Sequence, residues 1–192
     1  MTTRHTKISS LLLWLIFTIV LFSCDFFQTA QQLYKSGLDH YNSADHGDTH
    51  DYVGLEKAIA DFEKSIKKGF KDRDVFDKLT WSYRILNQDN KNMERVYSLA
   101  LENFPNDIEF YFRRGDSRKE QKKHKSALED YNKAISLDTA RKYEYINSAF
   151  YERGAMKYIL GDTVNADKDR EIAQSITDHE LRTYHDYCQL WK

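Results

Sequence analysis

The stretch from residue 111 to residue 134 constrains the fold more than any other part of the sequence. Gly115 lies in the first of two predicted short helices, and Ala127, Tyr131 and Ala134 follow in the second at spacings of four and three. Residues at these spacings share one face of a helix. The small residues allow two helix backbones to approach closely, while the tyrosine ring fills the space around the crossing. This stretch therefore predicts a pair of packed helices, which cannot bury its apolar face alone.

Three more copies of the pattern occur along the chain. The corresponding residues are Gly37, Ala58, Phe62 and Ser65 in the first copy, Thr80, Met93, Tyr97 and Ala100 in the second, and Gly154, Ala166, Arg170 and Ala173 in the fourth. Arg170 stands where the other copies carry an aromatic residue, so the packing beyond it must differ. The first copy contains an insertion, roughly residues 42 to 54, and about five extra residues, 142 to 146, precede the fourth copy.

Four copies at nearly constant spacing resemble the tetratricopeptide repeat (TPR), a helix-turn-helix unit of about 34 residues; other helical-hairpin repeats are the alternative. The resemblance implies an all-α fold, a right-handed α-solenoid of about four units with a C-terminal capping helix. The expected units are 30–72, 73–107, 108–146 and 147–177, followed by a cap at 178–192. We expect residues 142–146 to extend the first helix of the fourth unit, with Asp138 or Thr139 as its N-cap. The capping helix is expected over 178–191, with Cys188 buried.

The N-terminus has the features of an export signal. Basic residues precede an apolar run, Leu11 to Phe22, which is too short to span a bilayer comfortably. The run ends in Leu21-Phe22-Ser23-Cys24, which resembles a bacterial lipobox. The resemblance implies a lipoprotein signal peptide at 1–23, acyl chains such as palmitate on Cys24, and a tether at 24–29; an uncleaved signal anchor is the alternative. Lys, Asn and Tyr usage is similar to that of Bacteroidota. We therefore expect a domain facing the periplasm, anchored to the inner or outer membrane of a bacterial envelope.

In TPR proteins the first helix of each unit lines a concave groove that binds an extended peptide or a helix. Carried onto this chain, the resemblance implies that the partner-binding residues are Tyr34, Tyr41, Trp81, Arg84, Phe112, Arg113, Lys119, Tyr151 and Tyr158. Tyr, Trp and Arg are the residues most often found as binding hot spots. Packing of several of these aromatic side chains against neighbouring helices is the alternative interpretation. Asparagine is absent at the positions that a chaperone-binding carboxylate clamp would need, so that ligand is not expected.

The insertion in the first unit is rich in histidine and aspartate. His46 and His50 are weak candidates for binding zinc or another divalent ion, because imidazole and carboxylate groups together can hold such ions. Their spacing matches no metal motif, and a solvated acidic loop is the alternative. His50 or Asp51 is also suited to cap a helix that starts near Tyr52.

No constellation of catalytic residues emerges from the sequence. It has no glycine-rich phosphate loop and no Gly-x-Ser-x-Gly elbow. The formal net charge is only −1, so a nucleic-acid surface is not indicated. We expect a non-catalytic protein-interaction scaffold or adaptor with a protein or peptide partner and neither cofactor nor small-molecule substrate. The alternative is a binder of a small ligand, glycan or divalent metal, through the insertion or the groove.

Overall fold

The computed structural model describes residues 28–46 and 49–189, and the side chains of residues 45, 46, 49 and 50 are not described. The helices are α2 (Ala30–Ala44), α3 (Tyr52–Lys67), α4 (Arg73–Asn87), α5 (Asn90–Asn103), α6 (Ile108–Glu120), α7 (His124–Leu137), α8 (Ile146–Ile159), α9 (Thr163–Gln174) and α10 (Tyr184–Cys188). A small antiparallel pair of two-residue strands, β1 (Asp45–His46) and β2 (Thr49–His50), forms a hairpin between α2 and α3. Within the described part of the chain, no helix combines the length and the hydropathy needed to cross a bilayer. The predicted signal peptide and Cys24 lie outside the described residues, as does most of the tether.

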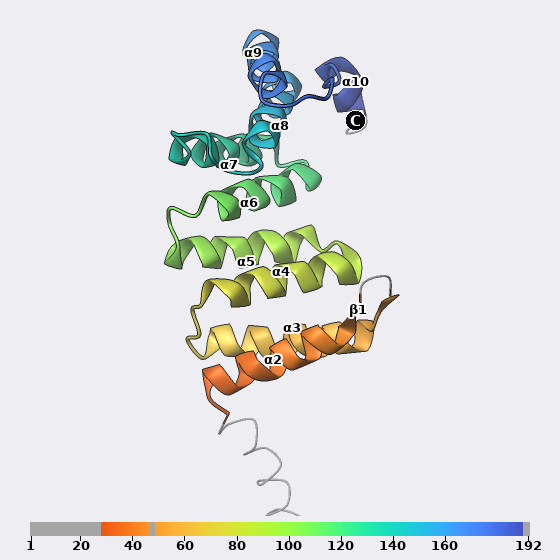
Figure 1. Ribbon diagram of the computed structural model, residues 1–192, viewed down its shortest axis with the longest axis vertical. Helices are drawn as coiled ribbons and strands as arrows, with labels where there is room; N and C mark the ends of the chain where they lie inside the picture. The colour runs from red at the N-terminus through yellow and green to blue at the C-terminus, as the bar shows by residue number, and fades with distance from the viewer. Residues whose placement is uncertain (1–27, 47–48, 190–192) are drawn as a thin grey trace, which may run out of the picture.

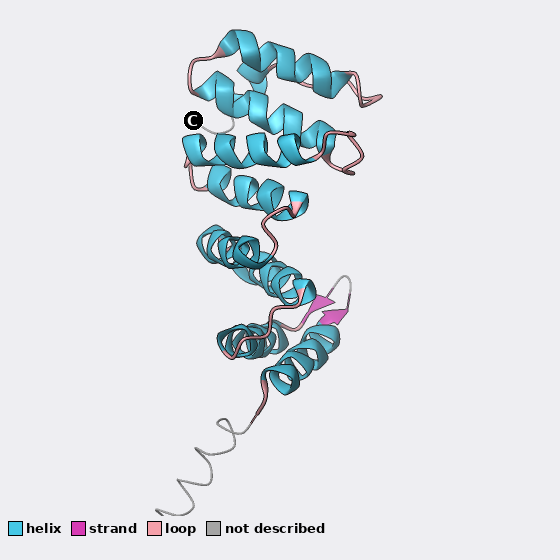
Figure 2. Ribbon diagram, turned by 90° about the vertical axis from the view of Figure 1, so that its left-hand side faces the viewer, coloured by secondary structure: helices cyan, strands magenta, loops and turns pink. Residues whose placement is uncertain are grey.

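The helices form an α-solenoid, as the sequence predicts. Each odd-numbered helix from α3 to α9 packs against the helix before it, giving four pairs, and each pair packs against the next (Figure 1). The chain thus rises from α2 at one end to α8 and α9 at the other. Figure 2 shows the small hairpin projecting beside the first pair of helices.

Most helices begin at an aspartate whose side chain accepts a backbone hydrogen bond from the first turn. These N-caps are Asp51, Asp72, Asp89, Asp107 and Asp162, and Thr183 serves α10 in the same way. Each such cap satisfies one of the N–H groups that a helix start leaves unpaired. The expectation that His50 or Asp51 caps the helix near Tyr52 is confirmed for Asp51, which accepts from the Val53 N–H at 3.1 Å.

The expected extension of the fourth unit's first helix is wrong. α8 starts only at Ile146, and neither Asp138 nor Thr139 is its N-cap. The Asp138 carboxylate instead accepts hydrogen bonds from the backbone N–H groups of Lys142 and Tyr143. Because the side chain competes for these N–H groups, the chain turns here and does not continue as a helix.

In three of the four units a glycine in the first helix makes room for an aromatic ring. A Cβ on Gly37 would lie 2.7 Å from ring carbons of Phe62, and one on Gly115 would lie 2.8 Å from a ring carbon of Tyr131. Both rings belong to the second helix of the same unit. In the fourth unit, where that helix carries Arg170, the space beside Gly154 is filled by Tyr184 of α10. The prediction that packing beyond Arg170 differs is confirmed.

Buried ion pairs hold the two helices of the third and fourth units together. Arg114 donates two hydrogen bonds to Asp130, and Arg118 reaches the same carboxylate at 2.8 Å. Arg153 binds Asp169 through two nitrogens in the same way. The side chains of both aspartates are only 3% exposed, so each carboxylate depends on its cations for charge compensation.

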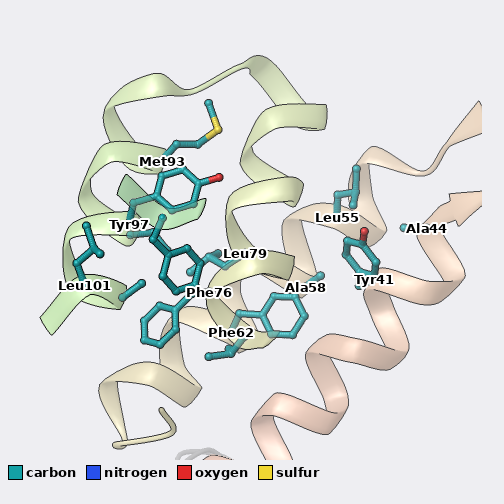
Figure 3. Packing of buried hydrophobic residues seen from close by; sticks show 14 residues of the cluster. Tyr41, Ala44, Leu55, Ala58, Phe62, Phe76, Leu79, Met93, Tyr97 and Leu101 are labelled. Atoms are coloured by element: carbon teal, nitrogen blue, oxygen red, sulfur yellow. The ribbon is translucent and has the colours of Figure 1, made fainter. Parts of the chain in front are cut away.

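The buried side chains form two clusters that meet at α6. The first cluster spans α2 to α5 and ends with Phe110 (Figure 3). The second cluster starts with Phe112 and runs through α7, α8 and α9 to α10. Tyr111 packs against both clusters. A single helix therefore contributes to both parts of the core.

The C-terminal segment differs from the predicted cap. The expected helix over residues 178–191 is not formed: residues 178–183 are not helical, and α10 has five residues. α10 packs on α8 and not, as expected of a cap, over the outer face of α9, where Val164 remains 67% exposed. The expected burial of Cys188 is confirmed, because its exposed fraction is 2%.

Candidate functional site

Two adjoining hollows run along one side of the solenoid. The upstream hollow, about 280 Å³, is lined by Tyr41, Asp77, Lys78, Thr80, Trp81, Arg84, Tyr97, Glu109 and Arg113. The central hollow, about 440 Å³, is lined by Arg84, Gln88, Asn90, Met93, Phe112, Arg113, Asp116, Ser117, Lys119, Glu120, Tyr145, Ser148 and Glu152. Arg84 and Arg113 line both hollows, and we call the two adjoining hollows together the groove. Most of its residues come from α4 and α6, with contributions from α2, α5 and α8.

The upstream hollow presents an unusually exposed aromatic surface. Trp81 is 46% exposed, although large aromatic side chains usually bury most of their area. Nearby, the Lys78 ammonium lies 5.0 Å from the centre of the Tyr41 ring, within the range of a cation–π interaction. Tyr97, which is 5% exposed, contributes to the wall of the hollow. A partner side chain placed on the indole ring would bury apolar area that is now in water.

The central hollow has a rigid aromatic wall. The rings of Phe112 and Tyr145 are nearly parallel, with centroids 6.2 Å apart. The guanidinium of Arg113 lies 4.9 Å from the Tyr145 centroid and 5.6 Å from that of Phe112. Tyr145 reaches this position because the chain turns before α8. Stacking of this kind fixes the arginine in place without using its hydrogen-bond donors.

The side chains of Arg84 and Arg113 line both hollows. Burial raises the pKa of the Tyr97 hydroxyl, and the positive charges of Arg84 and Arg113 oppose this rise. Arg113 has a carboxylate oxygen of Glu109 at 3.7 Å, but the other oxygen of Glu109 is held by Arg73 at 2.8 Å. The middle of the groove therefore carries positive charge that described carboxylates compensate only in part.

Acidic side chains gather at the far wall of the central hollow. Burial raises the pKa of Asp116 to about 6, and Glu152 adds to this rise while Lys119 opposes it. Burial also raises the pKa of Glu120. The Lys119 ammonium lies 3.0 Å from a Glu152 oxygen, and its side chain is only 8% exposed. In the upstream hollow, burial similarly raises the pKa of Asp77 to about 6, against the opposing effect of Arg73.

The structure places six of the nine predicted groove residues along the hollows: Tyr41, Trp81, Arg84, Phe112, Arg113 and Lys119. That these residues contact a partner stays a prediction. Tyr34 lines neither hollow, because its ring stacks on Phe70 at 4.5 Å and its hydroxyl donates to Asp74 at 2.7 Å.

Tyr151 and Tyr158 are also outside the two hollows. Their rings pack against Tyr184 of α10, at centroid distances of 5.1 Å and 6.1 Å. For these two side chains and Tyr34, packing against neighbouring segments is therefore what the structure shows.

Several lining residues are not among those that the sequence predicts. Met93 and Tyr97 lie on a second helix, where the repeat pattern predicts a role in the helix crossing, yet they also line the hollows. Tyr145 lies in the stretch for which the sequence predicts an extended helix. The signal for its true position was Asp138, since an aspartate four residues before Lys142 can accept its N–H and make a turn.

The structure describes only the backbone of the two candidate metal ligands. His46 and His50 lie on the paired strands β1 and β2, but their side chains are outside the described part of the structure. Among the side chains that are described, no group of three His, Cys, Asp or Glu residues is arranged to hold a metal ion. Metal binding by the hairpin stays a prediction.

Comparisons with known proteins agree with the solenoid fold. Residues 108–141 match the tetratricopeptide repeat family. No curated protein matches the sequence. The fold is similar to the crystal structure of MamA, with 16% identity, a TM-score of 0.59, and coverage of 76% of this chain and 77% of that one. It is also similar to YrrB, described as a TPR protein with an unusual peptide-binding site, with 22% identity, a TM-score of 0.60, and coverage of 78% and 70%.

Proposed function

We propose that this chain, a tetratricopeptide repeat protein, acts as a non-catalytic scaffold that binds a protein or peptide segment in the groove formed by its two hollows. TPR proteins are generally interaction scaffolds, and the similar fold of YrrB carries a peptide-binding site. The observation that carries the proposal is the lining of two adjoining hollows that share Arg84 and Arg113: the half-exposed Trp81 lines one, and the stacked rings of Phe112 and Tyr145 line the other.

The groove has the composition of a binding hot spot. Rigid aromatic side chains lose little conformational entropy on binding, and arginine adds several directed hydrogen-bond donors. Aromatic side chains and arginines line both of the adjoining hollows. A peptide lying along the groove would bury Trp81 and offer hydrogen-bond acceptors to the guanidinium groups of Arg84 and Arg113. Both the buried apolar area and the new hydrogen bonds would favour binding.

A photo-crosslinking experiment tests this proposal directly. The photoreactive residue p-benzoylphenylalanine replaces Trp81 in the groove and, as a matched control, the exposed Lys67 at the end of α3. We expect a discrete adduct in cells from position 81 and none from position 67. The adduct should disappear when Arg84→Gln and Arg113→Gln are added. Equal adducts from both positions, or an adduct that the double substitution leaves unchanged, would place binding elsewhere on the solenoid.

We further propose that Cys24 carries a lipid anchor and that the solenoid faces the periplasm of a bacterial envelope. The support is the sequence: the lipobox-like Leu21-Phe22-Ser23-Cys24 follows an apolar run. An acylated cysteine would hold the groove close to the membrane and raise its effective concentration for partners there. Cys24→Ser should leave an uncleaved precursor or release the protein from the membrane fraction. Normal cleavage and membrane retention of that variant would exclude the anchor.

A further inference from the structure

The position of α10 differs from that of every other helix that follows a completed pair. At the three earlier junctions, α4 packs mainly on α3, with a smaller contact to α2, while α6 packs on α5 and α8 on α7, so the incoming helix chiefly covers the second helix of the preceding unit. α10 instead packs on α8, the first helix of its unit (Figure 1). The first helices contribute much of the groove. α10 therefore lies on the same kind of helix that lines much of the groove in the earlier units, and its main contact is not with the second helix of the preceding unit.

The central contact of α10 is made by Tyr184. Its side chain is 1% exposed, and its ring packs between Tyr151 and Tyr158 of α8. The hydroxyl donates to the Tyr151 carbonyl oxygen at 2.9 Å. The ring lies against Gly154, where a Cβ would come within 2.6 Å of its Cζ atom. The site thus has an aromatic slot whose floor is a glycine.

Two further residues of α10 complete the contact. The Tyr187 hydroxyl donates to Glu152 at 2.6 Å, and its ring lies 4.9 Å from that of Tyr151. The Cys188 sulfur lies 3.9 Å from the Ala155 carbonyl oxygen. Residues 184, 187 and 188 have spacings of three and four, so they form one face of the short helix. The bound segment therefore reads as Tyr-x-x-Tyr followed by a small residue.

We propose that the face of α8 formed by Tyr151, Gly154 and Tyr158 is a docking site for a short helix that carries two tyrosines three residues apart and then a small residue. α10 occupies this site from within the chain, and a partner segment with the same pattern displaces it. The inference rests on the proposed function for the existence of a partner, but its evidence is separate: it comes from an occupied site. The residues that α10 covers include Tyr151 and Tyr158, which the repeat pattern assigns to partner binding.

The length of α10 favours exchange. A helix of five residues is not stable by itself in water, so α10 depends on its contacts with α8. The non-helical residues 178–183 connect it to the rest of the chain. Such a tether keeps the segment at a high effective concentration, so a partner competes successfully only when it is locally concentrated or binds more tightly.

The site is also linked to the central hollow. The same Glu152 oxygen accepts from the Tyr187 hydroxyl and lies 3.0 Å from the Lys119 ammonium. Glu152 and Lys119 both line the central hollow. When α10 leaves, Glu152 loses one of its two donors and the wall of that hollow changes. Occupation of the two sites is therefore coupled.

Cys188 provides a reporter for the release of α10. The chain has two cysteines, so Cys24→Ser leaves Cys188 as the single thiol of the full chain. We expect Ellman's reagent to label Cys188 at least 100-fold faster than global unfolding allows, at a rate that low urea barely changes. Glu152→Gln should increase this rate, whereas Glu120→Gln, which removes a charge from the same hollow, should not. Labelling that follows global unfolding would mean that α10 is a fixed part of the core.

A peptide added in trans tests the recognition pattern. The probe is a fluorescein-labelled peptide with the sequence of residues 180–192 in which the residue at 188 is changed by Cys188→Ala. We expect it to bind the full-length Tyr184→Ala variant at least tenfold more tightly than the unmodified chain, whose site is occupied. Binding should be lost when the peptide carries Tyr184→Ala and Tyr187→Ala. No binding by a Tyr184→Ala variant with an unchanged circular dichroism spectrum would overturn the proposal. If that variant does not fold, the labelling rates of Cys188 decide.

The two proposals can fail separately. Crosslinking from position 81 reports on the upstream hollow of the groove and does not involve α10. Rapid release of α10 without a crosslink at position 81 would support the docking site and count against the proposed groove function. The reverse result would leave the groove as the partner site and α10 as a structural element.

Discussion

The Tyr184 ring packs against Gly154 in the same way as the Tyr131 ring packs against Gly115. In the third unit the ring comes from the second helix of the same unit. In the fourth unit, Arg170 occupies the corresponding place on α9, and the ring is supplied by α10. The two glycines are therefore equivalent in sequence and in local packing, but only one of them holds a segment that can leave.

Substitution of the two glycines by alanine should have different effects. Gly115→Ala places a methyl group against Tyr131 in the core, so we expect a loss of about 1–3 kcal/mol in the free energy of unfolding. Gly154→Ala should instead expel Tyr184, with a much smaller change in stability, because α10 can move away. Urea denaturation measures the first effect, and labelling of Cys188 in the Cys24→Ser background measures the second. A Gly154→Ala variant that is strongly destabilised but labels slowly would contradict this distinction.

Arg170→Tyr should restore the aromatic residue that the fourth unit lacks. The new ring would lie on α9 at the position that corresponds to Tyr131, and it would compete with Tyr184 for the space beside Gly154. We expect faster labelling of Cys188 and an unchanged or higher thermal midpoint. Arg170→Lys is the control, since lysine cannot fill the slot. Identical labelling rates for both variants would show that the two positions are not equivalent.

Asp130 should be the most sensitive charged residue of the third unit. Its carboxylate is 3% exposed and compensates both Arg114 and Arg118. Asp130→Ala would leave two partly buried guanidinium groups without this partner, so we expect the free energy of unfolding to fall by about 3–5 kcal/mol. The neighbouring Glu129 is exposed, and Glu129→Ala should change stability by less than about 0.5 kcal/mol. Urea denaturation of both variants provides the comparison, and similar losses would rule out a special role for the buried pair.

Asp116 should make stability depend on pH. Its pKa is raised by burial to about 6 from an ordinary value of 3.8, so the folded state holds this proton more tightly than the unfolded state. Stability is therefore lost as the pH rises between about 4 and 6. Asp116→Asn cannot ionise, yet its side-chain oxygen can still accept the hydrogen bond that Tyr131 donates to Asp116 at 2.9 Å.

We expect Asp116→Asn and the unmodified chain to be about equally stable at pH 4. At pH 7.5 the variant should be more stable by roughly 1–3 kcal/mol, because one pKa unit corresponds to about 1.4 kcal/mol. Urea denaturation at the two pH values gives both differences. The exposed Asp167 offers a control, Asp167→Asn, that should show no such gain. If the stability of the variant relative to the unmodified chain falls between pH 4 and pH 7.5, the prediction is wrong.

The repeated helix pairs could be predicted because their signal is local and recurs. Gly115, Ala127 and Tyr131 lie close together in sequence, and the same spacing returns in the fourth unit at Gly154 and Ala166. The N-cap at Asp51 is equally local. The repeat pattern predicts many of the residues that line the two hollows, because these residues lie on the face of each first helix that is turned away from its partner helix.

The ends of the groove could not be predicted in the same way. Tyr34 is covered by Phe70, and Tyr151 is covered by α10, through contacts between segments that are distant in the sequence. The turn at Asp138 depends on a side chain that competes with helix hydrogen bonds, a balance that periodicity does not reveal. Arg170 did carry a signal, because it showed that a ring was missing, but not which residue would replace it.

The division of the core at α6 has a consequence for cooperativity. Repeat solenoids tend to fray from their ends, since each unit contacts only its neighbours. Phe110 belongs to the first cluster and Phe112 to the second, so neither half can melt completely while α6 keeps its packing. Arg113 and Lys119 of the groove lie on this helix. A partner that holds them would therefore stabilise both clusters at once, although it touches only the middle of the solenoid.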